Sequence, residues 1–214
     1  MIVYVESNFI LELALEQEES AAAEALLLGA EQLLLQLVIP AFSLSEPFST
    51  MAHRSRERTR LGKQLEENFR QLRRSRRHAA TIQPVENTPV VLLGLEKAES
   101  DMLDLVTTRA LQHARHIELT SSIFARALDY RREYDLSTSD AIIYASVIAD
   151  ARKQAPGERK LFISRNTKDF DIPQVRSELA SLSAQYCESF TEGLFEIEQQ
   201  GTVVPRPPPR PGVP

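Results

Sequence analysis

Cysteine is nearly absent from this chain of 214 residues, in which Cys187 is the only one. A single cysteine cannot form a disulfide within the chain, and this fits a protein kept in a reducing compartment. The amino terminus begins with the strand-like segment MIVYV and lacks the basic-then-apolar pattern of a signal peptide. These absences predict a cytoplasmic protein.

Long hydrophobic runs are also missing. The most apolar stretch, residues 21–42, is interrupted by four polar side chains, Glu24, Glu31, Gln32 and Gln36. A membrane span needs about 20 mostly apolar residues, so this stretch predicts a core helix followed by a strand. No membrane association is expected.

Several nucleotide and metal motifs are lacking as well. The chain contains no G-x-x-x-x-G-K-S/T loop and no G-x-G-x-x-G, which argues against NTPase and dinucleotide-binding functions. Its four histidines do not have the H-E-x-x-H spacing of a zinc hydrolase. His113 and His116 are expected on the surface near a helix end.

Basic residues, in contrast, are concentrated in one segment. Ten Lys or Arg against three Glu lie between His53 and His78, whereas the rest of the chain carries 15 basic and 27 acidic residues. A basic stripe on an acidic body can orient a polyanion such as RNA. Phe69 is the only aromatic residue in the segment, so stacking on bases is not supported there.

The arginine spacing of this segment suggests specific contacts. Arg54 and Arg58 are four residues apart, as are Arg73 and Arg77, which would place each pair on one face of a helix. These four residues are the predicted RNA contacts of the segment. A solvated charged helix and a docking surface for an acidic protein are the alternatives.

Strand-like and helix-like patterns alternate along the chain. Short apolar runs typical of buried parallel strands occupy Ile2–Val5, Leu37–Ile39 and Leu161–Ser164, with a weaker candidate at Gln185–Glu188. Helical periodicity covers Ala21–Leu35, Ser121–Tyr134 and Ala141–Arg152. The alternation predicts an α/β fold in which a mostly parallel central sheet lies between two layers of helices, α/β/α.

Residues 1–200 are predicted to form a single domain with a helical insertion. Residues 48–115 are too long for one crossover connection and look helical from Ser49 to about His78 and again over Leu95–His113, with a break at Thr88-Pro89. Residues 201–214 form a Pro-rich tail, which from Val203 onward is expected to be extended and unpacked.

Four acidic residues stand where these elements begin or end. Glu6 follows the first strand, Glu46 follows the second, Asp140 opens a helix and Asp169 comes just after the strand at 161–164. Ligands of open α/β sheets bind at the carboxyl ends of the strands, so these acids are expected to share one crevice. Carboxylates crowded there would repel one another unless a hard divalent cation bound between them.

Helix capping offers another explanation for several of these residues. Ser7 or Asn8 could cap the helix after the first strand, and the pairs Ser43–Glu46 and Ser137–Asp140 have the spacing of a capping box. Pro47 restricts the backbone before it and weakens the regular-helix interpretation of Glu46. The capping and metal-binding interpretations of Glu46 both stay open.

Taken together, these motifs resemble the PIN-domain ribonucleases, and within them the toxin components of bacterial toxin–antitoxin pairs. The resemblance rests on IVYVESNFI, on Glu46, and on the segments STSDAIIYASVIA and LFISRNTKDFD. It implies an endoribonuclease that uses Mg²⁺ or Mn²⁺ and leaves a 5′-phosphate. It also implies an RNA substrate, an inhibitory antitoxin-like protein and a homodimer as partners.

The resemblance assigns roles to residues of this chain. The catalytic acids would be Glu6, Glu46, Asp140 and Asp169, of which Glu6, Asp140 and Asp169 would contribute to metal binding. Asn8, Ser139 and Asn166 would support them, and Arg165 would join the RNA contacts.

One residue departs from the family pattern. Glu6 stands where the family usually has aspartate, and Mg²⁺ tolerates little deviation from octahedral geometry. The alternative function is therefore a catalytically degenerate PIN-like module that binds RNA or another protein.

Overall fold

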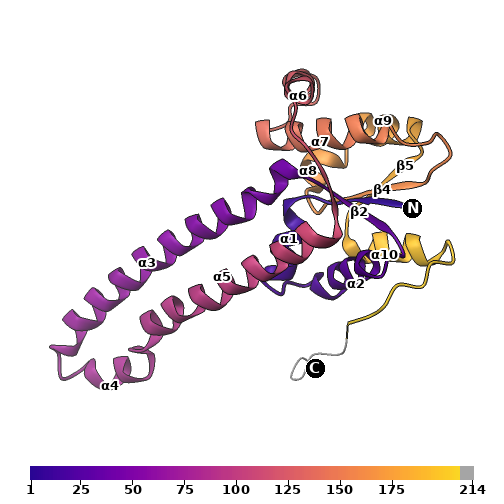
Figure 1. The fold of residues 1–214 in the computed structure, drawn as a ribbon. Helices are drawn as coiled ribbons and strands as arrows, with labels where there is room; N and C mark the ends of the chain where they lie inside the picture. Colours follow the sequence, from indigo (N-terminus) through magenta and orange to yellow (C-terminus); the bar gives the residue numbers. More distant parts are fainter. Residues whose placement is uncertain (208–214) are drawn as a thin grey trace.

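The computed structural model describes residues 1–207, and a five-stranded, entirely parallel sheet forms its centre (Figure 1). The strands lie in the order β3-β2-β1-β4-β5. Their bounds are β1 (Ile2–Tyr4), β2 (Gln36–Pro40), β3 (Arg115–Ile117), β4 (Lys160–Ile163) and β5 (Ala184–Cys187). Four of these were predicted as apolar runs. The fifth, β3, was missed because two of its three residues are polar and only Ile117 is buried.

Helices cover both faces of the sheet. They are α1 (Ser7–Ala14), α2 (Ser20–Glu31), α3 (Glu46–Arg73), α4 (Ala79–Ile82), α5 (Thr88–His113), α6 (Ser121–Glu133), α7 (Thr138–Ala151), α8 (Thr167–Phe170), α9 (Pro173–Ser181) and α10 (Phe190–Glu198), with 3₁₀ turns η1 (Ala41–Leu44) and η2 (Gln83–Val85). In Figure 1, α1, α2 and α10 lie below the sheet and α6, α7 and α9 above it. The predicted three-layer α/β/α fold is confirmed.

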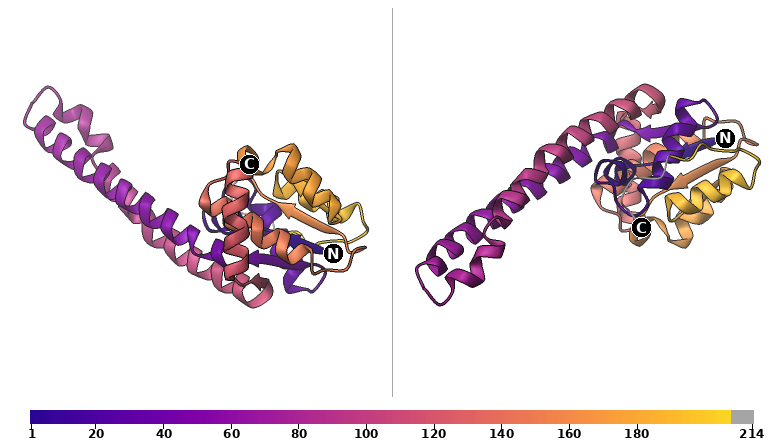
Figure 2. Two further views of the ribbon diagram at one scale, coloured as in Figure 1. Left: turned by 90° about the horizontal axis from the view of Figure 1, so that it is seen from above. Right: turned by 90° about the horizontal axis from the view of Figure 1, so that it is seen from below.

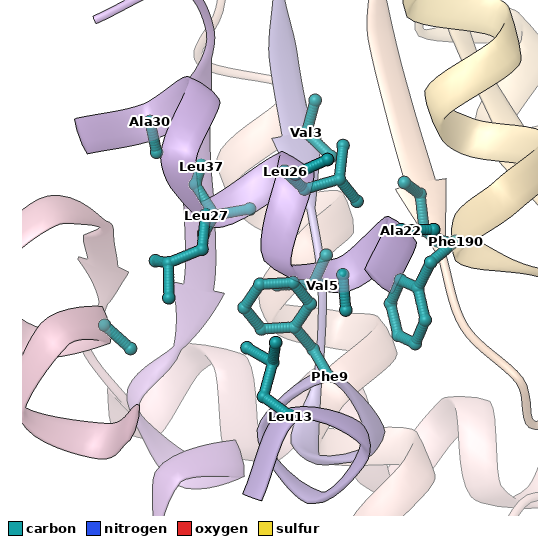
Figure 3. Close-up of a cluster of buried hydrophobic side chains, with 14 of the residues drawn as sticks. Val3, Val5, Phe9, Leu13, Ala22, Leu26, Leu27, Ala30, Leu37 and Phe190 are labelled. Carbon is teal, nitrogen blue, oxygen red and sulfur yellow. The ribbon is translucent and has the colours of Figure 1, made fainter. Parts of the chain in front are cut away.

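Two apolar cores follow from the alternation of side chains along each strand. Val3 and Val5 point into one core with Phe9 of α1 and Phe190 of α10, whose rings meet edge to face at 5.5 Å between centroids (Figure 3). Tyr4, from the same strand, enters the other core beneath α7. Because burying a large apolar side chain contributes about 1.5–3 kcal/mol, these cores hold the strand ends in fixed positions.

Helices α3 and α5 form a long antiparallel hairpin that projects from the sheet (Figures 1 and 2). At 1.5 Å per residue each is about 40 Å long. Pro89 stands in the first turn of α5, where a proline is favoured at a helix start. Helix α3 ends at Arg73, short of the predicted His78, so the prediction that Arg73 and Arg77 share one helical face is wrong.

Two further expectations differ from the structure. His113 is exposed at the end of α5, but His116 lies in β3, half-buried, where desolvation lowers its pKa. Its Nε2 atom has no hydrogen-bond partner among the described residues. The tail was expected to be unpacked from Val203, yet Val204 is 2% exposed and joins the core beneath α2.

The remainder of the predicted tail, residues 208–214, lies outside the described residues. Within residues 1–207, no helix combines the length and the apolar character that a membrane crossing requires.

Candidate active site at the carboxyl edge of the sheet

The strand order creates a crevice beside β1. From β1 the chain adds β2 and then β3 on one side, and afterwards crosses to add β4 and β5 on the other. Ligands of open α/β sheets bind at such a reversal, because the loops leaving adjacent strands diverge there. A cleft of about 780 Å³ lies at this point, between the segments that follow β1, β2 and β4 and the start of α7.

Most of the predicted site residues line this cleft. Three of the four acids are there, Glu6, Glu46 and Asp140. The predicted supporting residues Asn8, Ser139 and Asn166 line it too, together with Arg165. The convergence of residues that are up to 160 positions apart follows from the parallel strands, whose carboxyl ends share one edge.

Glu6 is a deeply buried acid of the cleft, with 3% of its surface exposed. It is the N-cap residue of α1, and its Oε2 atom accepts hydrogen bonds from the Asn8 amide at 2.9 Å and from Ser7 Oγ at 2.8 Å. Its Oε1 atom accepts one from Ser164 Oγ, directly after β4, at 3.0 Å. The alternative that Ser7 or Asn8 caps this helix is therefore wrong.

Two opposing influences act on the Glu6 carboxyl. Burial raises its pKa and is the largest effect, and the nearby charge of Glu46 raises it further. The three hydrogen bonds that favour the ionised form lower it in part. Glu6 and Glu46 thus interact electrostatically across the cleft, and a cation placed between them would relieve their repulsion.

Asp140 is held in place by residues from two different elements. Ser137 is the N-cap of α7, where its Oγ accepts a hydrogen bond from the Asp140 amide at 3.2 Å and donates one to Asp140 Oδ2. Asn166, in the loop after β4, donates from Nδ2 to Asp140 Oδ1 at 2.9 Å. The predicted capping role of Ser137 is confirmed, and the position of Asp140 in the first turn of α7 favours a negative charge.

Glu46 does not belong to a capping box. It is the first residue of α3 and is half-buried, while the preceding Ser45 makes no side-chain cap. Ser43 lies in the η1 turn, fully buried, and its Oγ has no hydrogen-bond partner among residues 1–207. The Ser43–Glu46 capping interpretation is wrong, because η1 separates Ser43 from the first turn of α3.

Asp169 is the one predicted acid that is not among the residues lining the cleft. It sits in the short helix α8, which begins one residue after the cleft-lining Asn166, and it is half-buried. The adjacent Phe170 is fully buried, with its ring centroid 5.1 Å from Phe162 and 6.3 Å from Tyr144. The ring is thus anchored in the core as expected, and the inclusion of Asp169 in the acidic set stays a prediction.

Another buried acid of the cleft was not anticipated. Glu12 of α1 is 1% exposed, and its Oε2 accepts a hydrogen bond from Arg165 Nη1 at 2.6 Å. Arg165 also contacts Glu18 at 3.3 Å, and its hydrogen bond with Glu12 is the main reason that its pKa is raised. Glu12 follows Asn8 by four residues, so helical spacing was the signal that could have placed it at the cleft.

The donor atoms of the cleft suit a hard cation, because Glu6, Glu46 and Asp140 offer only oxygens. No group of three His, Cys, Asp or Glu within the described part of the chain is arranged to hold a metal ion. Mg²⁺ generally takes one or two protein carboxylates and completes its octahedron with water and substrate phosphate. Glu6, Glu46 and Asp140 therefore offer the oxygen atoms that such an ion prefers, without forming a prearranged group of three ligands among the described residues.

Comparison with known families gives a match that covers this site. The sequence profile described as PIN domain matches residues 3–170. This chain belongs to the PIN domain family. No curated protein and no solved structure matches it significantly. The matched part of the PIN domain begins within β1 and extends through β4, and it contains every acid discussed above as well as the hairpin of α3 and α5.

The predicted RNA-contacting arginines of this PIN domain have different environments. Arg58 is bonded through both of its terminal nitrogens to Glu99 of α5, at 2.5 and 2.9 Å, and Arg73 lies 3.5 Å from Glu86. Both are thus engaged within the hairpin. Arg77 is exposed in the turn after α3, and Arg54 is half-buried on the part of α3 nearer the sheet.

Of the four predicted arginines in the basic segment, Arg54 is the one that follows the cleft-lining residues of α3 most closely in sequence. Glu46 and Thr50 line the cleft from the first turns of α3, and Arg54 follows at the same four-residue spacing. Residues spaced in this way lie on one face of a helix, at a rise of about 6 Å per step. Arg54 is therefore about 12 Å along the helix from Glu46, on the face that leads out of the cleft.

Proposed function

We propose that this PIN domain is a metal-dependent endoribonuclease that hydrolyses RNA phosphodiester bonds at the cleft. The observation that carries the proposal is the convergence of Glu6, Glu46 and Asp140 on a single cleft at the reversal of the sheet. Such a set of carboxylates attracts a divalent cation, and PIN domains as a family are nuclease-type folds.

The four acids would have different roles in the reaction. Glu6 and Asp140 would hold a Mg²⁺ or Mn²⁺ ion, and Glu46 and Asp169 would orient water or a second ion. When bound, such an ion activates water and stabilises negative charge on a transferring phosphoryl group. Water would add to phosphorus as the bond to the 3′ oxygen breaks, leaving a 5′-phosphate and a 3′-hydroxyl.

The fixed orientation of Asp140 supports this assignment. Its two oxygens are held by Ser137 and Asn166, from separate elements, so it would meet a ligand without reorganising. Prearranged charges of this kind contribute more to catalysis than mobile ones, because no energy is spent on ordering them during the reaction. Asn166 would act here as a positioning residue.

The experiment compares the wild-type protein with Asp140→Asn on a mixed RNA pool in Mg²⁺ or Mn²⁺. We expect cleavage that is lost on chelation and reduced at least about 100-fold by Asp140→Asn, because the substitution removes a proposed ligand charge at nearly constant side-chain size. The amide nitrogen replaces one accepting oxygen, so the contact with either Ser137 or Asn166 must rearrange. Asp104→Asn, an equivalent change on the exposed surface of α5, is the matched control and should cleave normally. Equal activity of Asp140→Asn and wild type would exclude this site.

A second experiment concerns the path of the RNA. Arg54→Ala should weaken RNA binding and reduce the salt dependence of the affinity by about one phosphate contact. Arg56→Ala provides the control, because Arg56 is exposed on the same helix but points away from the face shared by Glu46 and Thr50. If both substitutions weaken RNA binding equally, the summed positive charge of the whole basic segment attracts the RNA, and the proposed contact at Arg54 is wrong.

A non-catalytic RNA-binding module is the second candidate, and one observation favours it. The Glu6 carboxylate already accepts three hydrogen bonds and caps α1, so it has a structural role independent of any metal. Under this alternative, the purified protein would bind RNA with unchanged affinity in chelator and would not cleave in either metal. That result would overturn the nuclease proposal.

A further inference from the structure

Arg165 contacts two carboxylates in the cleft, and these differ sharply in their exposure to solvent. Its Nη1 atom donates to Oε2 of Glu12 at 2.6 Å and to Oε2 of Glu18 at 3.3 Å. The Glu12 side chain is 1% exposed, whereas that of Glu18 is 83% exposed. All three residues line the cleft that contains Glu6 and Asp140. The arginine of the cleft therefore has one buried partner and one partner that is open to solvent.

Glu12 is held through both of its carboxylate oxygens. While Oε2 accepts from Arg165, Oε1 accepts a hydrogen bond from the backbone amide of Glu19 at 2.5 Å. Glu19 is itself anchored, because its carboxylate accepts hydrogen bonds from the amide of Thr191 at 2.7 Å and from Thr191 Oγ1 at 3.1 Å, in the first turn of α10. A buried carboxylate that lost its arginine would be left without a compensating charge, which is strongly unfavourable. Glu12 and Arg165 are therefore expected to stay paired in the folded protein.

Glu18 is held less firmly than Glu12. An exposed ion pair is weak because water solvates both charges, and Glu18 can turn into solvent without leaving its own charge buried and unpaired. The pKa of Glu18 is lowered, first by a hydrogen bond with its own backbone and then by Arg165, so its carboxylate is ionised at neutral pH. Glu18 is thus a negative charge that Arg165 can release.

The charges of this group oppose phosphate binding while Glu18 is in place. The three side chains then carry one positive and two negative charges, although arginine is the side chain best suited to bind phosphate. When Glu18 turns into solvent, Glu12 alone balances Arg165 and a donor of Nη1 becomes free. The Nε and Nη2 atoms take no part in either pair, and they form the flat edge with which arginine binds two oxygens at once. An entering phosphate would therefore replace Glu18 and leave Glu12 in place.

We propose that Glu18 occupies the phosphate-binding position of Arg165 when RNA is absent, and that Glu12 is the positioning residue that holds Arg165 when RNA displaces Glu18. The inference rests on the proposed function for the identity of the anion, a backbone phosphate of RNA. Glu18 then acts as a competitor built into the chain. Removing Glu18 and removing Glu12 should have opposite effects on RNA binding, although both carry the same charge and contact the same arginine.

The test measures the affinity for a fluorescently labelled single-stranded RNA by anisotropy, in chelator so that metal-dependent cleavage cannot occur. Glu18→Gln should bind about two- to fivefold more tightly than wild type, because the RNA no longer displaces a charge. Glu12→Gln should bind at least about fivefold more weakly, because Arg165 loses its buried partner and pairs with Glu18 instead. Its salt dependence should fall by about one phosphate contact. A general electrostatic effect of the cleft would strengthen binding in both variants.

A double-mutant cycle shows whether Glu18 acts through Arg165. Arg165→Gln removes the positive charge but keeps a hydrogen-bond donor, and in that background Glu18→Gln should change the affinity less than about 1.5-fold. Glu16→Gln is the matched control and should bind RNA like wild type, because Glu16 is exposed in the same loop between α1 and α2 but does not line the cleft. Circular dichroism and urea unfolding check that each variant is folded under the binding conditions.

The outcomes separate this proposal from the nuclease proposal. Binding by Glu18→Gln that is no tighter than wild type would contradict the competitor role, and so would an unchanged effect of Glu18→Gln in the Arg165→Gln background. A folded Glu12→Gln that binds RNA as tightly as wild type or more tightly would contradict the positioning role. If Glu12→Gln does not fold, Glu18→Gln and the cycle decide the matter alone. Absence of cleavage in either metal, together with the expected binding pattern, would refute the nuclease proposal and support this one.

Discussion

Glu6 offers the sharpest test of the site, because its structural and chemical roles can be separated by two substitutions. Glu6→Gln removes the charge and keeps the shape of the side chain. Glu6→Ala removes both. If Glu6 is a metal ligand, RNA cleavage should be lost whenever the charge of residue 6 is removed. The free energy of unfolding should instead decrease only when the hydrogen bonds that Glu6 accepts are removed.

The expected stability changes follow from the three accepted hydrogen bonds. With alanine, the Asn8 amide and the hydroxyls of Ser7 and Ser164 lose their acceptor, and α1 loses its cap. A buried donor without a partner costs about 1–3 kcal/mol, but the two hydroxyls can rotate, so a loss of about 2–4 kcal/mol is expected. Removing an N-cap accounts for about 1 kcal/mol of this loss.

With glutamine, the loss should be much smaller. The amide oxygen can keep the bonds from Asn8 and Ser7, and only the contact with Ser164 must rearrange. Weakening charged hydrogen bonds to neutral ones costs about 1 kcal/mol, and relieving the burial of an ionised carboxylate offsets it. We therefore expect the stability of Glu6→Gln to lie within about 1 kcal/mol of wild type.

The assays are urea unfolding followed by circular dichroism and RNA cleavage in Mg²⁺ on the same preparations. Glu6→Gln should be folded and at least about 100-fold less active, as expected when a charged ligand is neutralised. Retention of wild-type cleavage by Glu6→Gln would refute the assignment of Glu6 as a ligand. An unchanged urea midpoint for Glu6→Ala would refute the hydrogen-bonding argument.

The remaining predictions concern packing and reactivity. Gly193→Ala should lower stability by about 1–2 kcal/mol on thermal unfolding, because its Cβ would lie 2.2 Å from Ile163 Cδ1; Gly94→Ala in α5, with no atom within 4 Å, should be neutral or stabilising. Val204→Ala should cost about 1–2 kcal/mol in urea unfolding if the start of the tail packs as described, and no change would contradict it. Burial raises the pKa of the Cys187 thiol to about 12. At pH 8 this thiol should therefore react with a disulfide reagent roughly 1,000-fold more slowly than an ordinary thiol for as long as the protein is folded. Rapid labelling of the native protein would contradict this prediction.

Local patterns predicted those elements whose sequence signal is itself local. The apolar runs of β1, β2, β4 and β5 and the cap at Ser137 could be recognised because a short segment carries the whole signal. Strand β3 was missed, since its Arg115 and His116 are held by pairing with β2 and not by their own hydrophobicity. The predicted end of α3 was also wrong, because the arginines beyond Arg73 still favour a helix in the sequence, whereas the tertiary contacts that stabilise α3 do not continue there.

The same distinction between local sequence patterns and tertiary contacts applies to the candidate acids. The sequence by itself determined the class of fold, the parallel sheet and the location of Glu6, Glu46 and Asp140 at one edge of it. Glu6 and Glu46 come after parallel strands, and Asp140 opens the helix that leads back to the start of the next strand, so all three lie at the carboxyl edge. It could not determine that Glu46 is free of a capping role, that Asp169 is not among the residues lining the cleft, or that Glu12 binds Arg165 within it. Those outcomes depend on side-chain directions, which are set only when the helices pack against the sheet.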